Sequence, residues 1–243
     1  MKIIVLCPDV NESFYKFAVN KKSEIRFGLG AIKGVGESAV NSIVEERKQN
    51  GIYKSFSDFV KRVDLRSCNK RTIESLVLSG GFDSFEIDRS RYFHLEDGQS
   101  YIEKMIKFGN KIQQDKSSTQ IDIFGGAQEI ELESPKAPIC EKWKTMEFLT
   151  KEKEVVGIYL SAHPLDDHLK ALELFSSAPL SALNDLDPLI NKDFYFTGII
   201  NDFEKLTSKN GNGWAKFILE DLEDQYEFRI FGEEFLRFSH FIN

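Results

Sequence analysis

The sequence predicts an α+β protein with a mainly helical first part and an all-β last part. Apolar residues recur with helical spacing in several segments between residues 37 and 172, whereas between residues 194 and 231 they alternate along three short runs. The chain has 243 residues and 41% apolar content, which is enough for two compact units. We therefore expect several domains, with the change from helices to strands between residues 177 and 192.

The composition excludes several classes of protein. No apolar run approaches the length of a membrane span, and the apolar stretch 3–6 is too short for a secretory signal. The three cysteines are far apart and odd in number, which predicts reduced thiols and a cytoplasmic location. The histidines form no metal-ligand spacing with them, so we expect no zinc site.

The strongest functional signal follows three short extended pieces, expected at 3–6, 14–19 and 25–29. Ile32-Lys33-Gly34-Val35-Gly36 predicts a tight hairpin that opens into a helix over 37–48, closed by a left-handed cap at Asn50-Gly51. The glycines let a nucleic-acid strand approach, the helix start offers unpaired N–H groups, and Lys33 adds a cation. This is the core of a helix-hairpin-helix, which grips DNA phosphates without reading bases. A plain turn before a helix is the alternative.

The charge distribution favours the DNA interpretation. Residues 21–71 contain twelve basic and six acidic side chains, a net charge of +6 in a chain of −7, so the remainder carries −13. Such asymmetry suggests one face built for a polyanion.

A second helical pair resembles the first in layout. Ser55 is expected to start a helix through residue 63, and Asn69 to cap another that ends at Gly80-Gly81. Its hairpin lacks a G-x-G, so it would be a degenerate second helix-hairpin-helix. Lys70 and Arg71 lie in the first turn, where cations oppose the helix dipole, so they indicate either an anion at that point or a solvated basic face.

Beyond this pair we expect one long helix from an Asp88 cap to about residue 114, with a kink at Gly98, followed by a polar linker to residue 140. An apolar island interrupts the linker. It is either a tether packed on its own domain or a docking peptide for a partner, and its residues are Gln120, Ile121, Asp122, Ile123 and Phe124. Helices over 143–160 and from Pro164 come next, and Asp185-Leu186-Asp187 is interpreted as a loop.

The last part predicts strands at 194–206, 214–220 and 226–231, then a helix from Glu233. This is the opening of an OB-fold barrel, which needs five strands, so we expect a segment of a longer polypeptide. Phe217 and Leu219 are expected inside the barrel. Trp214, Lys216 and Arg229 are expected outside, as a platform for single-stranded nucleic acid, although Trp214 next to a glycine turn is as often a lid on the core.

The chain resembles the alpha subunit of the bacterial replicative DNA polymerase III in the part after the catalytic palm and thumb. The phrases that carry the resemblance occur in order along nearly the whole chain, at residues 6–13, 25–36, 69–71, 80–83, 120–124 and 157–165. The resemblance implies five regions: the end of the fingers (1–24), a tandem helix-hairpin-helix domain (25–115), a linker with a clamp-binding peptide (116–140), a helical connector (141–190) and the start of an OB-fold (191–243).

In this family the hairpins are expected to hold double-stranded primer-template DNA, the pentapeptide 120–124 to dock on the sliding clamp, and the OB domain to lie near the single-stranded template. Other replicase subunits are expected partners. Polymerisation belongs to palm aspartates with two divalent ions, expected to be magnesium, and that palm is absent here. The resemblance thus implies a segment of a nucleotidyltransferase with no catalytic residue, metal or cofactor of its own.

A standalone DNA-binding adaptor and the error-prone paralogue of the family are the alternatives. An unclosed barrel favours a segment of the polymerase over a standalone adaptor.

Overall fold

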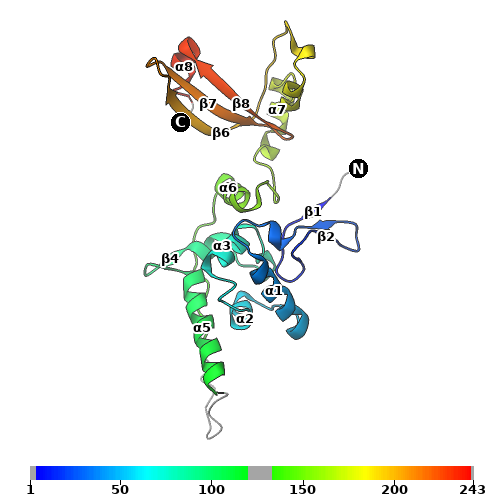
Figure 1. Cartoon of the computed structure of the whole chain (residues 1–243), viewed down its shortest axis with the longest axis vertical. Coiled ribbons are helices and arrows are strands. Elements are labelled where there is room, and N and C mark those ends of the chain that lie inside the picture. The colour runs from blue at the N-terminus through cyan, green and yellow to red at the C-terminus, as the bar shows by residue number, and fades with distance from the viewer. Residues whose placement is uncertain (1–3, 120–132, 242–243) are drawn as a thin grey trace. The chain divides into compact units, whose positions relative to one another are not determined.

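The computed structural model describes residues 4–119 and 133–241, and the side chains of 116–119 are not among those described. The described part contains eight α-helices and three small sheets, which confirms an α+β protein (Figure 1). The chain divides into two compact units, Met1–Ala162 and His163–Asn243.

The first unit begins with a small three-stranded sheet. Its strands are β1 (Val5–Leu6), β2 (Ala18–Val19) and β3 (Ile25–Arg26), in the order β1-β3-β2. β1 pairs with β3 in parallel and β2 pairs with β3 antiparallel. The expected extended pieces are confirmed, but each strand is only two residues long. A 3-10 turn (Leu29–Ala31) follows the sheet and leads into the glycine hairpin.

Three helices then form the frame of the first unit: α1 (Glu37–Asn50), α2 (Phe56–Arg62) and α3 (Lys70–Leu78). The predicted caps are confirmed. The Ser55 hydroxyl accepts the Asp58 N–H at 3.1 Å, and the Asn69 side chain accepts the Thr72 N–H at 3.1 Å. After α1, Gly51 has φ +82° and ψ 177°, so its backbone is extended there and not the left-handed helical cap we expected.

The core between these helices is aromatic. Phe56 lies 5.1 Å from Phe82 and 5.0 Å from Tyr92 between ring centroids, both in edge-to-face arrangements. Such pairs add to the free energy gained by burying the rings. Each of these three rings is at most 1% exposed. The frame that carries the hairpin is therefore densely packed.

The prediction of one helix from Asp88 to residue 114 is wrong. Asp88 does cap a helix, but this is the five-residue α4 (Arg89–Phe93), followed by the hairpin of β4 (Leu95–Glu96) and β5 (Gln99–Ser100) and then by α5 (Tyr101–Thr119). Asp97 and Gly98 have φ of +54° and +74°. Two consecutive positive φ values define the tight turn for which Asp-Gly is favoured, so Gly98 turns the chain back and does not kink a helix.

The described part of the predicted linker, residues 133–140, has no helix or strand and lies against α4. The Arg91 guanidinium donates to the Ala137 carbonyl at 2.8 Å and to the Pro138 carbonyl at 2.5 Å. Helix α6 (Thr145–Val156) follows. It is shorter than the expected 143–160 and ends at Gly157, whose φ of +88° is a left-handed cap.

A buried ion pair joins α6 to the rest of the first unit. Glu152 is fully buried, and one of its carboxylate oxygens lies 2.9 Å from the Arg89 guanidinium. Its other oxygen accepts the N–H groups of Leu160 and Ser161, each at 2.8 Å. The Arg89 guanidinium also donates to Asp83 at 2.6 Å. The segment after α6 is thus fixed to the loop that ends the second helical pair.

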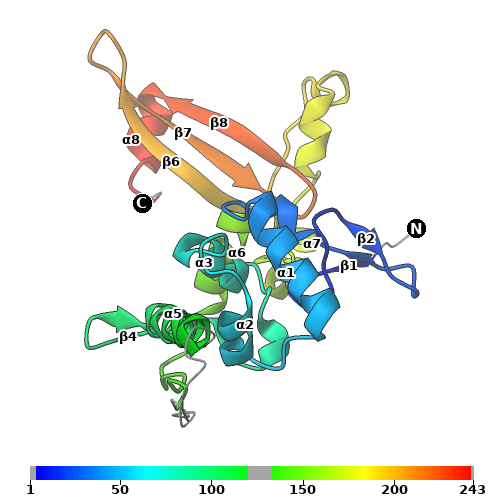
Figure 2. The same ribbon diagram turned by 60° about the horizontal axis from the view of Figure 1, so that its bottom comes forward.

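The second unit contains short helical turns and an antiparallel meander. A 3-10 turn (Asp166–His168) and α7 (Leu169–Phe175) are followed by 3-10 turns at Leu180–Asn184 and Asp187–Leu189. The strands β6 (Ile199–Thr207), β7 (Gly213–Glu220) and β8 (Gln225–Phe231) pair in that order, and α8 (Gly232–Phe238) packs on β7 and β8. The three strands and the following helix are confirmed (Figure 1 and Figure 2), although the first strand begins at Ile199 and not at residue 194. Their assignment to an OB-fold stays a prediction.

Candidate nucleic-acid interface

The glycine hairpin has the backbone geometry that the sequence predicted. Gly34 has φ +89°, in the region that favours glycine, and Val35 donates its N–H to the Ile32 carbonyl at 3.1 Å. Lys33 donates its N–H to the Val155 carbonyl of α6 at 2.8 Å, while its side chain is exposed. Val35 is only 7% exposed and packs in the core, so of the four predicted hairpin residues its side chain is structural.

The start of α1 offers free backbone donors. Gly36 is the N-cap, and its φ of −83° and ψ of 159° are accessible to any residue. Among the described residues, the N–H groups of Gly36, Glu37 and Ser38 have no hydrogen-bond partner, because no side chain caps this helix. Unpaired donors at a helix N-terminus carry partial positive charge and attract anions. A Cβ added at Gly36 would meet no atom within 4 Å, so the approach to these donors is open.

The hairpin lies against α3. The Thr72 hydroxyl donates to the Gly34 carbonyl at 3.2 Å, and a Cβ added at Gly34 would lie 2.8 Å from Ser75 Oγ and 3.6 Å from Arg71 Nε. The structure therefore brings the first hairpin beside the exposed Arg71. The two glycines have different roles, because Gly34 is required by packing while Gly36 leaves the surface open.

Lys70 is compensated within the protein. Its ammonium lies 2.8 Å from Glu103 of α5 and 3.7 Å from Glu74. The hydrogen bond to Glu103 raises the pKa of Lys70 above its usual value. These carboxylates offset the unfavourable position of a cation in a first helical turn, so that position does not by itself require a bound anion.

Much of the basic charge in residues 21–71 is used internally. The Arg47 guanidinium is buried and donates to the carbonyls of Val10 at 2.6 Å and Ser13 at 2.8 Å. Arg26 forms an ion pair with Glu12. These arginines hold the loop at residues 10–13 to α1 and to β3, so the net charge of +6 overstates the cationic surface.

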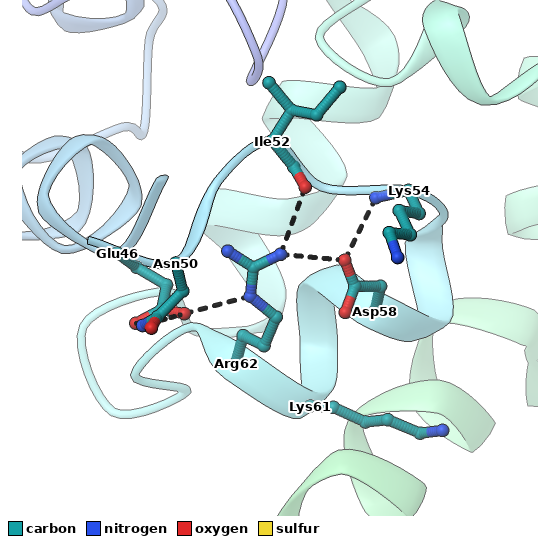
Figure 3. Close-up of a pocket in the computed structure, with 7 residues that line it drawn as sticks. All are labelled: Glu46, Asn50, Ile52, Lys54, Asp58, Lys61 and Arg62. Carbon is teal, nitrogen blue, oxygen red and sulfur yellow. Dashed lines mark hydrogen bonds and ion pairs between the residues drawn. The ribbon is translucent and has the colours of Figure 1, made fainter. Parts of the chain in front are cut away.

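Figure 3 shows a third internal use of basic charge. Arg62 lies between two carboxylates, 2.9 Å from Glu46 and 2.8 Å from Asp58, and it donates to the Ile52 carbonyl at 3.2 Å. It also donates to the Gly51 carbonyl at 2.7 Å. The pocket that these residues line with Asn50, Lys54 and Lys61 thus has its central cation already paired.

In the second unit the three predicted residues share one face of the sheet. Trp214 and Lys216 are two residues apart on β7, and Lys216 lies opposite Arg229 of β8. Trp214 stacks on Phe231 with ring centroids 5.4 Å apart and planes at 17°. Phe231 is 55% exposed. Sequence reasoning missed Phe231, although its alternation with Arg229 along β8 places both on the same face.

Both cations of this face are paired with carboxylates. Lys216 lies 3.1 Å from Glu204 of β6, and the Arg229 guanidinium lies 2.6 Å from Glu227. An incoming phosphate would have to compete with these partners. The aromatic pair is therefore the more distinctive feature of this face.

The predicted clamp-binding residues, Gln120, Ile121, Asp122, Ile123 and Phe124, lie outside the described residues. Within the described ranges no group of three or more His, Cys, Asp or Glu side chains has the arrangement of a metal site. No helix in the same ranges is long and apolar enough to cross a membrane.

Comparison with known proteins gives a consistent result. Residues 2–92 match the family model of the helix-hairpin-helix motif. DNA polymerase III subunit alpha of Saccharopolyspora erythraea is 34% identical over 98% of this chain, that of Borreliella burgdorferi is 34% identical over 99%, and that of Deinococcus radiodurans is 35% identical over 98%. The chain spans about a fifth of the length of these curated relatives, between 18% and 20%.

Proposed function

Because the chain is related over nearly its whole length to a segment of the alpha subunit of DNA polymerase III, we propose that it is a non-catalytic segment of a replicative DNA-directed DNA polymerase. In this role it binds double-stranded primer-template DNA and the sliding clamp, and so supports processive DNA synthesis in the cytoplasm. The polymerising palm and its magnesium ions belong to the rest of the parent protein. We expect no primer extension by this chain alone, measured with magnesium and all four nucleotides.

The open N-terminus of α1 is the observation that supports duplex binding. The unpaired N–H groups of Gly36, Glu37 and Ser38 lie at the same end of the helix, and a Cβ added at Gly36 beside them would meet no atom within 4 Å. Exposed Lys33 and Arg71 flank them. Backbone donors recognise phosphate and not bases, so binding is independent of DNA sequence.

Salt dependence of duplex binding tests this proposal. If two to four phosphates are neutralised, log Kd should change with log salt with a slope of magnitude about 2 to 4. Gly36→Val places a branched side chain in the open approach and should weaken binding to all sequences alike. Gln49→Val, at the exposed other end of α1, is the matched control. Equal affinity of the two variants, both folded by circular dichroism, would refute phosphate binding at the hairpin.

Residues 120–124 are proposed as the clamp-docking peptide. In this mode Ile123 and Phe124 fill an apolar pocket, Gln120 donates and accepts hydrogen bonds through its amide, and Ile121 and Asp122 set the spacing. Burial of the two anchors contributes about 3 to 6 kcal/mol before ordering costs, so the isolated peptide should bind in the micromolar range or more weakly. DNA held by the hairpin would raise the effective concentration of the peptide at the clamp.

Calorimetry with the cognate sliding clamp tests the docking peptide. The double variant Ile123→Ala with Phe124→Ala should lose clamp binding without a change in melting temperature. The control, Ile121→Ala with Asp122→Ala, should retain most of it. If the anchor variant melts lower, residues 120–124 pack on their own domain instead; if it still binds the clamp, the docking assignment is wrong.

The second unit is proposed to lie near the single-stranded template, with the Trp214–Phe231 pair as the stacking surface and Lys216 and Arg229 beside it. Aromatic rings on a sheet face stack with bases of any sequence. Other replicase subunits are further expected partners of the parent protein.

A further inference from the structure

We propose that Lys107 and Lys111 of α5 extend the duplex-binding surface of the hairpin and bind further phosphates of the same DNA duplex. This inference rests on the proposed function, because it adds residues to the site around Gly34–Gly36. Neither lysine belongs to the helix-hairpin-helix match at residues 2–92.

A series of contacts connects the hairpin to α5. Gly34 contacts α3 through its hydrogen bond with Thr72, and the first turn of α3 also carries Arg71 and Lys70. The Lys70 ammonium lies 2.8 Å from Glu103, in the first turn of α5. From Glu103, Lys107 is one helical turn further along the same face and Lys111 is one turn beyond it. Helix α5 is thus connected to the hairpin through the first turn of α3, and the two lysines lie on the face of α5 that begins at Glu103.

Both lysines are exposed, and within the described residues neither forms an ion pair, a hydrogen bond or a cation–π contact. In this they differ from their basic neighbours. Lys104 is paired with Glu96 at 2.9 Å, and Lys61 lies over the Phe108 ring. The carboxylates nearest in sequence are Glu103, which is occupied by Lys70, and Asp115, which has its own partner.

The opposite side of α5 explains why this face stays outward. Ile102 and Met105 are fully buried, and the Gln113 amide donates to the carbonyls of Val60 at 3.0 Å and Val63 at 2.9 Å. Gly109 packs against the backbone of Val60. These contacts fix the rotation of the helix, so Lys107 and Lys111 point away from α2. Figure 1 shows that α5 starts beside α3 and that its far half projects beyond the other helices of the unit.

The spacing of the lysines suits a phosphate backbone. Residues four apart on a helix are separated by about 6 Å along its axis. Phosphates of one strand recur every 3.4 Å or so along the duplex axis, so two ammonium groups at this spacing can each reach a separate phosphate, and lysine side chains are long enough to adjust. Duplex DNA is therefore the occupant that fits the unpaired charge, its spacing and its continuity with the hairpin.

The test compares two double variants of the full 243-residue chain in duplex binding between 50 and 200 mM salt. Lys107→Gln with Lys111→Gln removes the proposed phosphate contacts. Lys21→Gln with Lys22→Gln removes the same charge from the β2–β3 turn. Loss of two phosphate contacts should lower the salt slope by about 1.8, so the affinity difference from wild type should shrink about tenfold over this salt range. The control should change the slope by less than about 0.5.

The outcomes separate this inference from the function on which it rests. A lower slope for the α5 variant alone would support the extended surface. An unchanged slope for the α5 variant, with Gly36→Val still impairing binding, would overturn the role of α5 and leave the hairpin in place. Equal loss in both lysine variants would also overturn it, because the effect would then follow net charge. A wild-type chain that does not bind duplex would overturn the proposed function itself.

Discussion

The two units of the chain hold their candidate binding residues in different ways. In the first unit the hairpin is built on a filled core, in which Leu29, Ile43 and Phe59 are fully buried. In the second, the buried apolar residues within the described ranges are Pro164, Leu165, Leu180 and Ala215, while Leu174, Leu236 and Phe241 are each 75% exposed or more. The second unit therefore has the smaller apolar core of the two.

Because of this difference, substitutions in the two units should affect stability and binding to different degrees. In the first unit, packing fixes the backbone of the hairpin, so a single change can alter either folding or binding. In the second unit, the platform residues contact each other and their acidic neighbours across a sheet, so substitutions there should change binding with little effect on stability.

The buried ion pair of the first unit should matter far more than its exposed counterpart in the second. Arg89→Met leaves Glu152 buried without its cation, and breaking a buried pair costs about 3 to 5 kcal/mol. Arg229→Met removes an exposed pair and should cost less than about 1 kcal/mol. Urea unfolding of both variants measures the difference. Similar losses in the two variants would mean that the units do not differ in this respect.

Substitution of the two hairpin glycines should have different effects, with Gly34→Val lowering stability and Gly36→Val lowering DNA binding. Gly34→Val forces a branched residue to φ +89° and places its Cβ 2.8 Å from Ser75 Oγ, which should cost about 2 to 4 kcal/mol. Gly36→Val has ordinary φ and open space, so its cost should stay below about 1 kcal/mol. Denaturant unfolding measures both. A Gly36 variant as unstable as the Gly34 variant would contradict this division.

On the sheet face, loss of a ring should weaken single-strand binding more than loss of a cation. Phe231→Leu removes the exposed ring of the stacked pair, and base stacking is worth about 1 to 3 kcal/mol per base. Lys216→Gln removes a cation already paired with Glu204, so its effect should be smaller. Fluorescence anisotropy with labelled oligothymidine measures both. A larger loss of affinity for Lys216→Gln would mean that charge, and not stacking, dominates single-strand binding on this face.

Acid should weaken the second unit through Asp221. Burial pushes the pKa of this carboxyl up, but the N–H groups of Leu180, Glu223 and Asp224 outweigh it and hold the pKa below its usual value. The stability that Asp221 contributes is therefore present above about pH 4, its unfolded pKa, and is lost as the pH falls through the folded value.

Melting of wild type and Asp221→Asn from pH 7 to pH 3 measures this smallest effect. The wild-type advantage should be greatest near pH 7 and should shrink below about pH 4. An advantage that grows in acid would mean that the folded pKa is raised and that burial dominates.

The sequence by itself determined the features that depend on a few adjacent residues. The Ser55 and Asn69 caps, the Gly34 turn and the order of the three last strands follow from local hydrogen bonds, allowed backbone angles and side-chain alternation. The turn that separates α4 from α5 also depends on adjacent residues, because Asp97-Gly98 is a favoured turn sequence. The helical spacing of the apolar residues on both sides nevertheless led to the prediction of one helix.

Only the tertiary structure decided which charges remain available to a ligand. Composition counts Arg47, Arg62 and Lys70 as equal parts of a basic region, yet Arg47 is buried on carbonyls, and the other two are paired with carboxylates from other helices. Likewise, the contact between Trp214 and Phe231 joins residues 17 positions apart. Whether a charged group or an aromatic ring is available to a ligand depends on the groups around it in space. Folding brings those groups together from distant parts of the chain.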